Sequence, residues 1–261
     1  MLLTVDIGNT NIVLGLFDGT GADAELLRDW RMRTDARMTA DEMALTFRGL
    51  LGEYADKVTG VAALSTVPAV LRELRVMVDR YWPQLPRVIV EPGVRTGVPL
   101  VCDNPREVGA DRIVNTLAAY TLYGGPAIVV DFGTSTNFDV VSARGEFLGG
   151  ALAPGIEISI DALATRAAQL VKVQLVRPRS VIGKNTVEAL QSGLLYGFAG
   201  QVDGLVRRIA AEIAPGAERD VAVIATGGLA PLLIAESQTI THHAPHLTLR
   251  GLRMIFARNI T

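Results

Sequence analysis

The chain carries the same short motif twice, once in each half. Residues 3–11 read LTVDIGNTN, and residues 129–137 read VVDFGTSTN. In each copy an apolar run ends in an aspartate, and the glycine two residues later is followed by hydroxyl and amide side chains. The two aspartates, Asp6 and Asp131, stand 125 positions apart, close to half of the 261 residues. This spacing predicts two copies of one domain, each offering an acidic glycine turn to the same phosphorylated ligand.

The composition excludes several classes of protein. Hydrophobic residues make up 49% of the chain, which is enough for two cores, and the net charge of −2 gives no basic field for nucleic acid or an anionic membrane. Cys102 is the single cysteine, so no internal disulfide can form. Residues 1–5 are too short for a signal-peptide core, and no apolar run approaches the ~18 residues that span a bilayer. We expect a cytoplasmic protein.

Apolar runs alternate with turn and capping signals in a pattern that predicts an α/β fold. Strands are expected at residues 2–5, 12–17, 26–32, 58–64, 87–90, 127–130, 138–141, 147–152 and 221–225. Helices are expected at residues 40–51, 67–82, 108–123, 156–168, 186–214 and 229–236, with a last helix starting near Thr248. The capping box of Thr39 and Glu42 marks the start of the first helix. The order predicts one domain over residues 1–115 and a second over residues 116–261.

The first glycine turn has the chemistry of a phosphate site. A glycine turn between strands leaves backbone N–H groups to face phosphate oxygens, and Asn9, Thr10 and Asn11 add neutral donors. Asp6 repels phosphate unless Mg²⁺ lies between them, directly or through water. By itself the segment also fits an ordinary hairpin turn. The second copy favours the phosphate site.

Residues 103–112, DNPREVGADR, combine a helix start with residues that capping does not explain. Asn104 as N-cap, Pro105 at the first position and Glu107 at the third fit a helix start. Gly109 costs ~1 kcal/mol inside a helix and would let a ligand or another backbone approach closely. In the adjacent pair Asp111–Arg112, a carboxylate could take the proton of an attacking hydroxyl and an arginine could bind an anion. A surface helix held by salt bridges is the alternative, and both stay open at this point.

The paired turns resemble the two phosphate motifs of the superfamily that includes actin, the sugar and acetate kinases and the chaperone ATPases. A Gly-Gly that follows a strand in that superfamily contacts the adenosine, and TGG at 226–228 stands in the expected order. The whole chain resembles a type III pantothenate kinase. The resemblance is carried by DIGNTN at 6–11, DNPREVGADR at 103–112, DFGTST at 131–136, PGI at 154–156, GKNTVEALQSG at 183–193 and TGG at 226–228. The GADR and KNT elements select this family within the superfamily.

The resemblance implies a fold, an activity and partners. The fold is two ribonuclease-H-like domains, each a mixed five-stranded sheet with helices on both faces, and ATP lies in the cleft between them. The activity is ATP-dependent phosphorylation of pantothenate to 4'-phosphopantothenate, the first step of coenzyme A biosynthesis. The cofactors are Mg²⁺ with ATP and a monovalent cation, K⁺ or NH₄⁺. The family is homodimeric, and the substrate site lies close to the partner subunit.

The resemblance also implies the residues of the site. The catalytic base is Asp111. The ATP-binding residues are Asp6, Ile7, Gly8, Asn9, Thr10, Asn11, Ile12, Val13, Gly133, Thr134, Gly227 and Gly228. The residues that contact pantothenate are Gly109, Ala110, Asp111, Arg112 and Thr186. Asp131 helps to bind the monovalent cation, and Asp6 binds Mg²⁺ directly or through water.

Some residues have a simpler interpretation, and two depart from the family pattern. Asn185 and Glu188 form a capping box that leaves the hydroxyl of Thr186 available to a ligand, while Lys184 fits a solvated side chain better than a phosphate clamp. The family often has an aromatic residue where Cys102 stands and a threonine where Asn137 stands. The histidines His242, His243 and His246 fit a polar loop better than a metal site.

Two other functions remain open on the sequence alone. One is a different small-molecule kinase with the same fold, against which the GADR and KNT elements speak. The other is an inactive relative that binds nucleotide and acts as a regulatory protein, against which the intact Asp6, Asp111 and Asp131 speak.

Overall fold

The computed structural model describes residues 1–21, 23–166 and 173–260. The chain consists of two compact units, each defined by the contacts that its residues make among themselves. The first unit comprises Met1–Val98, Arg106–Ala118 and Leu247–Thr261, and the second comprises Pro99–Pro105 and Ala119–His246. The last helix therefore groups with the first unit, whereas the sequence analysis assigned all of residues 116–261 to a second domain.

The first unit contains a mixed five-stranded sheet in the order β3-β2-β1-β4-β5. Its strands are β1 (Leu2–Ile7), β2 (Asn11–Phe17), β3 (Leu26–Arg33), β4 (Gly60–Ser65) and β5 (Arg87–Ile89). Strands β1, β2 and β3 pair antiparallel, while β4 and β5 run parallel to β1. All five strands were predicted from their apolar runs, with small differences at the ends.

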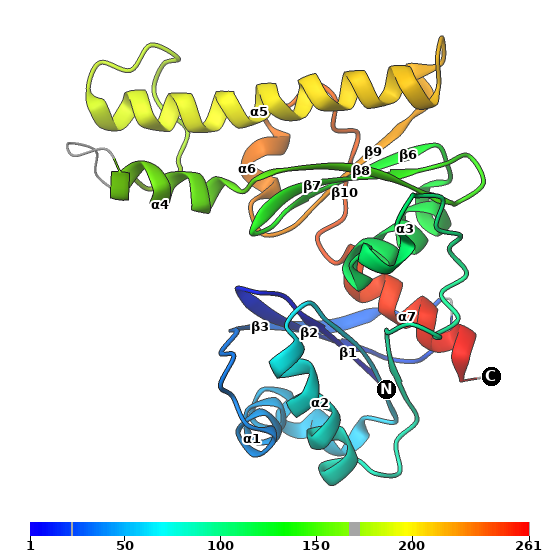
Figure 1. The fold of residues 1–261 in the computed structure, drawn as a ribbon. Helices are drawn as coiled ribbons and strands as arrows, with labels where there is room; N and C mark the ends of the chain where they lie inside the picture. Colours follow the sequence, from blue (N-terminus) through cyan, green and yellow to red (C-terminus); the bar gives the residue numbers. More distant parts are fainter. Residues whose placement is uncertain (22, 167–172, 261) are drawn as a thin grey trace. The chain divides into compact units, whose positions relative to one another are not determined.

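Helices cover both faces of this sheet. Leu3, Val5 and Ile7 of β1 face a core shared with α1 (Ala40–Leu51) and α2 (Pro68–Tyr81). The residues between them lie on the opposite face, because side chains alternate along a strand. Helix α7 (Leu247–Asn259) packs on that face (Figure 1). The contact is close: a Cβ at Gly15 would lie 2.7 Å from Thr4 Oγ1 and 2.8 Å from a methyl of Leu249.

Local signals start the helices of the first unit as predicted, with one exception. Glu42 accepts a hydrogen bond from the Thr39 N–H at 2.8 Å, and the Thr39 hydroxyl accepts from the Glu42 N–H, so the capping box is confirmed. The helix start predicted at Asn104 and Pro105 is wrong. Pro105–Glu107 forms a single 3-10 turn, and α3 (Ala110–Tyr123) begins after it. Gly109 therefore lies outside the helix interior, and its carbonyl accepts from the Arg112 N–H at 3.1 Å.

The second unit repeats the sheet of the first in the order β8-β7-β6-β9-β10. Its strands are β6 (Ala127–Phe132), β7 (Ser135–Val141), β8 (Phe147–Pro154), β9 (Ala222–Thr226) and β10 (His242–His243). As in the first unit, β6, β7 and β8 pair antiparallel. β9 runs parallel to β6, and β10 runs parallel to β9. The predicted duplication is confirmed. The polar loop expected at His242 and His243 is wrong, because both residues pair with the edge of β9.

Three helices cover the face of this sheet that carries Ile128, Val130 and Phe132 (Figure 1). They are α4 (Ile156–Arg166), α5 (Thr186–Ile213) and α6 (Ala230–Ile234). The last two residues of the helix predicted over 156–168 lie outside the described residues. Two further 3-10 turns are η1 (Gly52–Lys57) and η3 (Glu218–Asp220). Within residues 1–21, 23–166 and 173–260, no helix combines the length and apolar character needed to cross a bilayer.

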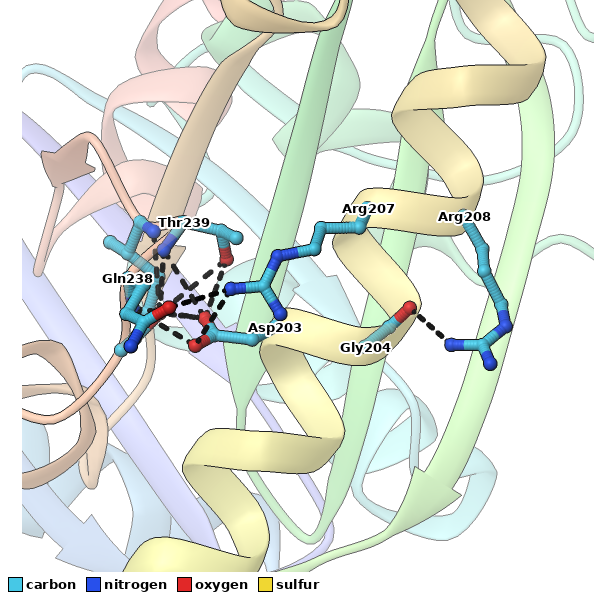
Figure 2. A network of polar contacts seen from close by, with 8 residues as sticks. Asp203, Gly204, Arg207, Arg208, Gln238 and Thr239 are labelled. Atoms are coloured by element: carbon cyan, nitrogen blue, oxygen red, sulfur yellow. Dashed lines mark hydrogen bonds and ion pairs between the residues drawn. The ribbon is translucent and has the colours of Figure 1, made fainter.

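A buried carboxylate ties the long helix α5 to the chain that follows α6. Asp203 accepts hydrogen bonds from the Ser237 hydroxyl at 2.7 Å, the Gln238 N–H at 3.0 Å and the Thr239 hydroxyl at 2.9 Å (Figure 2). Arg207, one turn along α5, lies 3.7 Å from the second carboxylate oxygen. Burial alone would raise the pKa of Asp203, but these donors outweigh it and hold the pKa below its usual range.

We expect Asp203→Asn to lower the free energy of unfolding by roughly 1.5–3 kcal/mol at pH 7, because an amide replaces a carboxylate among several donors. The wild-type pKa is lower in the folded state than in the unfolded one. The stabilisation is therefore fully present above the pKa of an aspartate in the unfolded chain, and it is lost as the pH falls through the lower folded-state pKa. Urea unfolding at pH 7 and pH 3 measures it. Asp220→Asn, at an exposed position, is the control, and equal losses at both pH values would contradict the prediction.

Candidate active site

The first glycine turn connects β1 to β2 and is closed by its own backbone. The Gly8 N–H donates to the Asn11 carbonyl at 3.0 Å, so this N–H does not face a ligand as the sequence analysis expected of the turn. Asn9 and Thr10 form the exposed tip. Thr34, which follows β3, donates from its hydroxyl to the Gly8 carbonyl at 2.7 Å. Sequence reasoning missed Thr34, because its place beside the turn depends on the pairing of β3 with β2.

Two predicted site carboxylates lie within electrostatic range of each other in the first unit. Asp6 stands near the end of β1 and keeps some contact with solvent. Burial raises the pKa of Asp6 to about 7, the carboxylate of Asp111 adds to the rise, and Arg31 opposes it. Burial also raises the pKa of Asp111, against the effects of the Arg112 N–H and the Arg112 charge. The structure thus brings together residues that are 105 positions apart in the chain.

The donors in this part of the first unit suit a magnesium ion. Mg²⁺ is usually held by one or two carboxylates, with water and substrate phosphates completing its coordination. Asp6 and Asp111 supply carboxylates whose mutual repulsion a cation would relieve. No group of three or more histidines, cysteines and acidic residues suited to a metal ion occurs among the described residues. Asp6 therefore fits a metal that arrives with its phosphate ligand better than a metal held by protein ligands alone.

Gly109 gives the carboxylate of Asp111 its room. A Cβ at Gly109 would lie 2.4 Å from Asp111 Oδ1. The same oxygen accepts a hydrogen bond from the Arg112 N–H at 2.9 Å. Within the described residues the group that lies against Gly109 is thus the carboxylate of Asp111, and the approach of a ligand or another backbone stays a prediction. Ala110 and Arg112 lie beside it in the first turn of α3.

The second glycine turn connects β6 to β7 and is one residue shorter than the first. The Gly133 N–H donates to the Ser135 carbonyl at 3.0 Å, and Asn137 pairs with Asp131 in the sheet register. Asn137 accepts from the Ser135 hydroxyl at 2.6 Å, so the residue that departs from the family pattern serves as a hydrogen-bond acceptor within the turn. Thr134 lies between Gly133 and Ser135 in the turn.

Gly227 brings the third motif against the second turn. Its φ of 91° favours glycine, and a Cβ there would lie 2.6 Å from both Asp131 Oδ1 and the Phe132 carbonyl oxygen. The TGG motif begins at the last residue of β9, which is parallel to β6. The motif and the second glycine turn therefore lie at the carboxyl ends of two neighbouring strands. Gly228 follows in the turn that leads into α6. The second unit thus gathers Asp131, Gly133 and Gly227 at one site.

The predicted pantothenate contact Thr186 is the exposed first residue of α5. Asn185 caps the helix by accepting from the Glu188 N–H at 2.9 Å. The predicted capping box is only half formed, because the Glu188 carboxylate accepts instead from the Lys184 N–H at 3.2 Å. The side chain of Lys184 is exposed, as expected of a solvated lysine.

The Type III pantothenate kinase family model matches residues 2–208. The chain belongs to the type III pantothenate kinase family. The type III pantothenate kinase of Saccharopolyspora erythraea is 70% identical over 262 residues, covering 99% of each chain. That of Rhodococcus erythropolis is 70% identical over 259 residues, covering 99% of this chain and 96% of the other.

A solved structure shares the fold of this type III pantothenate kinase family member at low sequence identity. It is the (R)-2-hydroxyglutaryl-CoA dehydratase component A of Acidaminococcus fermentans, with a TM-score of 0.55, 14% identity and coverage of 99% of this chain and 96% of that one. The likeness agrees with the two repeated sheets and bears out the predicted duplicated ribonuclease-H-like fold of the actin-like ATPases. The roles predicted for individual site residues stay predictions.

We expect Gly227→Ala to weaken ATP binding at least tenfold. The added methyl group would collide with Asp131 and Phe132 in a backbone conformation that L side chains rarely adopt, and strain of this kind costs about 1–3 kcal/mol. Calorimetric titration with ATP and Mg²⁺ measures the change. Gly193→Ala on α5, where a Cβ meets nothing within 4 Å, is the matched control. An unchanged affinity in a folded Gly227→Ala protein would contradict the prediction.

Proposed function

We propose that the chain transfers the γ-phosphoryl group of ATP to the primary hydroxyl of pantothenate, giving 4'-phosphopantothenate in the first step of coenzyme A biosynthesis. Membership of the type III pantothenate kinase family supports the reaction and its substrate. The observation that carries the mechanism is the pairing of Asp111 with Asp6, which sets a candidate base within electrostatic range of a candidate metal-binding carboxylate.

Phosphoryl transfer needs positioning and charge neutralisation more than covalent chemistry from the protein. Asp111 orients the pantothenate hydroxyl and accepts its proton, and the raised pKa of this carboxyl makes it a stronger base than an exposed aspartate. Arg112 holds an anion, either the pantothenate carboxylate or a phosphate. Gly109 and Ala110 also contact pantothenate, and Thr186 of α5 hydrogen-bonds it through its hydroxyl.

The nucleotide binds to the two glycine turns and the TGG motif. Residues 6–13 hold its phosphates in the first unit, and Gly133 and Thr134 hold them in the second. Gly227 and Gly228 contact the adenosine. Mg²⁺ bound with ATP offsets the negative charge that shifts during transfer, and Asp6 binds it directly or through water.

We propose that Asp131 helps to bind a monovalent cation, K⁺ or NH₄⁺. Asp131 is the penultimate residue of β6, its carboxylate lies near both Gly133 and Gly227, and it is partly exposed. A carboxylate with nearby backbone carbonyls is a suitable ligand set for a hard cation. The carbonyl of Phe132 lies against Gly227 beside it.

We also propose that the protein is a homodimer and works in the cytoplasm. The second unit exposes large apolar side chains on α4 and on the segment that leads into α5, and a partner subunit would bury them. They are Ile158, Leu163, Val176, Val181, Ile182 and Val187. Val187 follows Thr186 directly, so burial of this surface by a partner would bring that subunit close to the pantothenate contact. The single cysteine suits the cytoplasm, because it forms no internal disulfide.

We expect Asp111→Asn to lower kcat by 10²-fold or more while leaving ATP binding intact, because general-base catalysis typically contributes ~10²–10⁴-fold. Steady-state kinetics and calorimetric titration with ATP measure the two effects. Asp103→Asn changes an exposed acid of the same motif and is the matched control. Retention of more than about a tenth of the rate by Asp111→Asn would remove this residue as the base.

We expect pantothenate-dependent ADP release in K⁺ or NH₄⁺ and much slower release in Na⁺. Asp131→Asn should lose most of this stimulation, since a neutral amide binds a cation less tightly than a carboxylate. Equal rates in all three salts would argue against the cation site. A substrate panel of pantothenate and simple sugars, assayed in the same way, separates this function from another small-molecule kinase, and absence of turnover with intact ATP binding would favour the regulatory relative.

A further inference from the structure

Thr34 contacts the first glycine turn at two points. Its hydroxyl donates to the Gly8 carbonyl at 2.7 Å, and its backbone N–H donates to the Thr10 carbonyl at 3.0 Å. The side chain is partly buried, so water competes only in part for the hydroxyl. These bonds join the end of β3 to the segment that connects β1 and β2.

The bond to Gly8 sets the direction of a neighbouring donor. The C=O of Gly8 and the N–H of Asn9 belong to one planar peptide group, in which the two bonds point in opposite directions when the group is trans. The hydroxyl of Thr34 holds the C=O on its own side, so the N–H of Asn9 points away from Thr34 at the exposed tip. Since the Gly8 N–H is used by Asn11, Asn9 carries the next N–H along the turn.

The second unit has a glycine at the position that corresponds to Thr34. The residue after its third strand is Gly155, which follows the pair of Ser135 with Pro154 as Thr34 follows the pair of Asn11 with Arg33. A Cβ at Gly155 would lie 2.1 Å from the carbonyl oxygen of Thr134 in the second turn. The first turn thus has a threonine hydroxyl at the position where the second turn has the backbone of Gly155.

We propose that Thr34 is a positioning residue for ATP: its hydroxyl fixes the Gly8 carbonyl and so directs the Asn9 N–H toward a phosphate of the nucleotide. The inference rests on the proposed function, because it assigns the first turn to the phosphates of ATP. Thr34 acts through the turn and touches neither the reacting hydroxyl nor the phosphoryl group.

The test compares Thr34→Val, which removes the hydroxyl and keeps the shape, with Thr34→Ser, which keeps the hydroxyl. We expect Thr34→Val to lower kcat/KM for ATP about tenfold, the effect of one lost hydrogen bond with its acceptor left unpaired. KM for pantothenate should stay within twofold, and Thr34→Ser should recover most of the loss. Thr46→Val is the control, because the Thr46 hydroxyl also donates to a backbone carbonyl, that of Glu42 on α1.

Each outcome separates this inference from the proposed function. If wild-type protein turns over pantothenate and Thr34→Val keeps its kcat/KM for ATP within twofold, the inference is wrong and the function stands. Equal changes in the kinetic constants for both substrates, without recovery in Thr34→Ser, would indicate a structural role and also overturn it. If wild-type protein lacks turnover, the function fails, and calorimetric Kd values for ATP test Thr34 by the same comparison. Thr34→Ala replaces Thr34→Val if the latter fails to unfold cooperatively.

Discussion

The burial of the Asp6 carboxylate is the constraint around which the first unit is organised. Burying an ionised carboxylate is costly unless a cation or hydrogen-bond donors compensate it. β1 is the central strand, with β2 on one side and β4 on the other, so Asp6 stands in the middle of the sheet and is only partly exposed. Arg31 compensates part of the charge, and Asp111 adds to the imbalance. A divalent cation bound with the nucleotide would offset this charge.

The two units show how a duplicated fold diverges while its strand order stays fixed. Both keep three antiparallel strands followed by two parallel ones, and in both the glycine N–H donates to the first residue of the next strand, although the second turn is one residue shorter. The residue after the third strand differs, with a hydroxyl in one unit and no side chain in the other. The surroundings of the aspartate on the central strand differ as well, because the charge of Asp111 acts on Asp6 whereas Asp131 lies against Gly227. The repeated sheet thus presents a different partner to each carboxylate.

Much of the fold and part of the site could be predicted from the sequence. Strand positions followed from apolar runs, and the start of α1 followed from a capping box, because both signals act over a few residues. The failures involve longer range. β10 exists because β9 offers an open edge to His242 and His243, and no local propensity indicates it. The start of α3 moved to Ala110, since Gly109 serves better as the residue before a helix than inside one.

The same limit applies to the site. The sequence singled out Gly109 as a residue that would let a ligand or another backbone approach, and in the structure the group beside it is the Asp111 carboxylate. The contact of Gly227 with Asp131 could not be predicted, because the two residues are 96 positions apart and meet only in the folded chain. Thr34 escaped notice altogether. Its residue type is common at the end of a strand, and its partner Gly8 is 26 positions away.

The packing of α7 on the first sheet has a consequence for how the chain is made. Most multidomain chains fold from the N-terminus as each domain leaves the ribosome. Here one face of β1 and β2 packs against Leu249 of α7, and α7 is synthesised after all strands of the second sheet. Until α7 has been synthesised, the face beside Thr4 and Gly15 lacks the helix that covers it. The packing of the first unit can therefore be completed only after the second sheet has been translated, although most residues of the first unit are translated earlier.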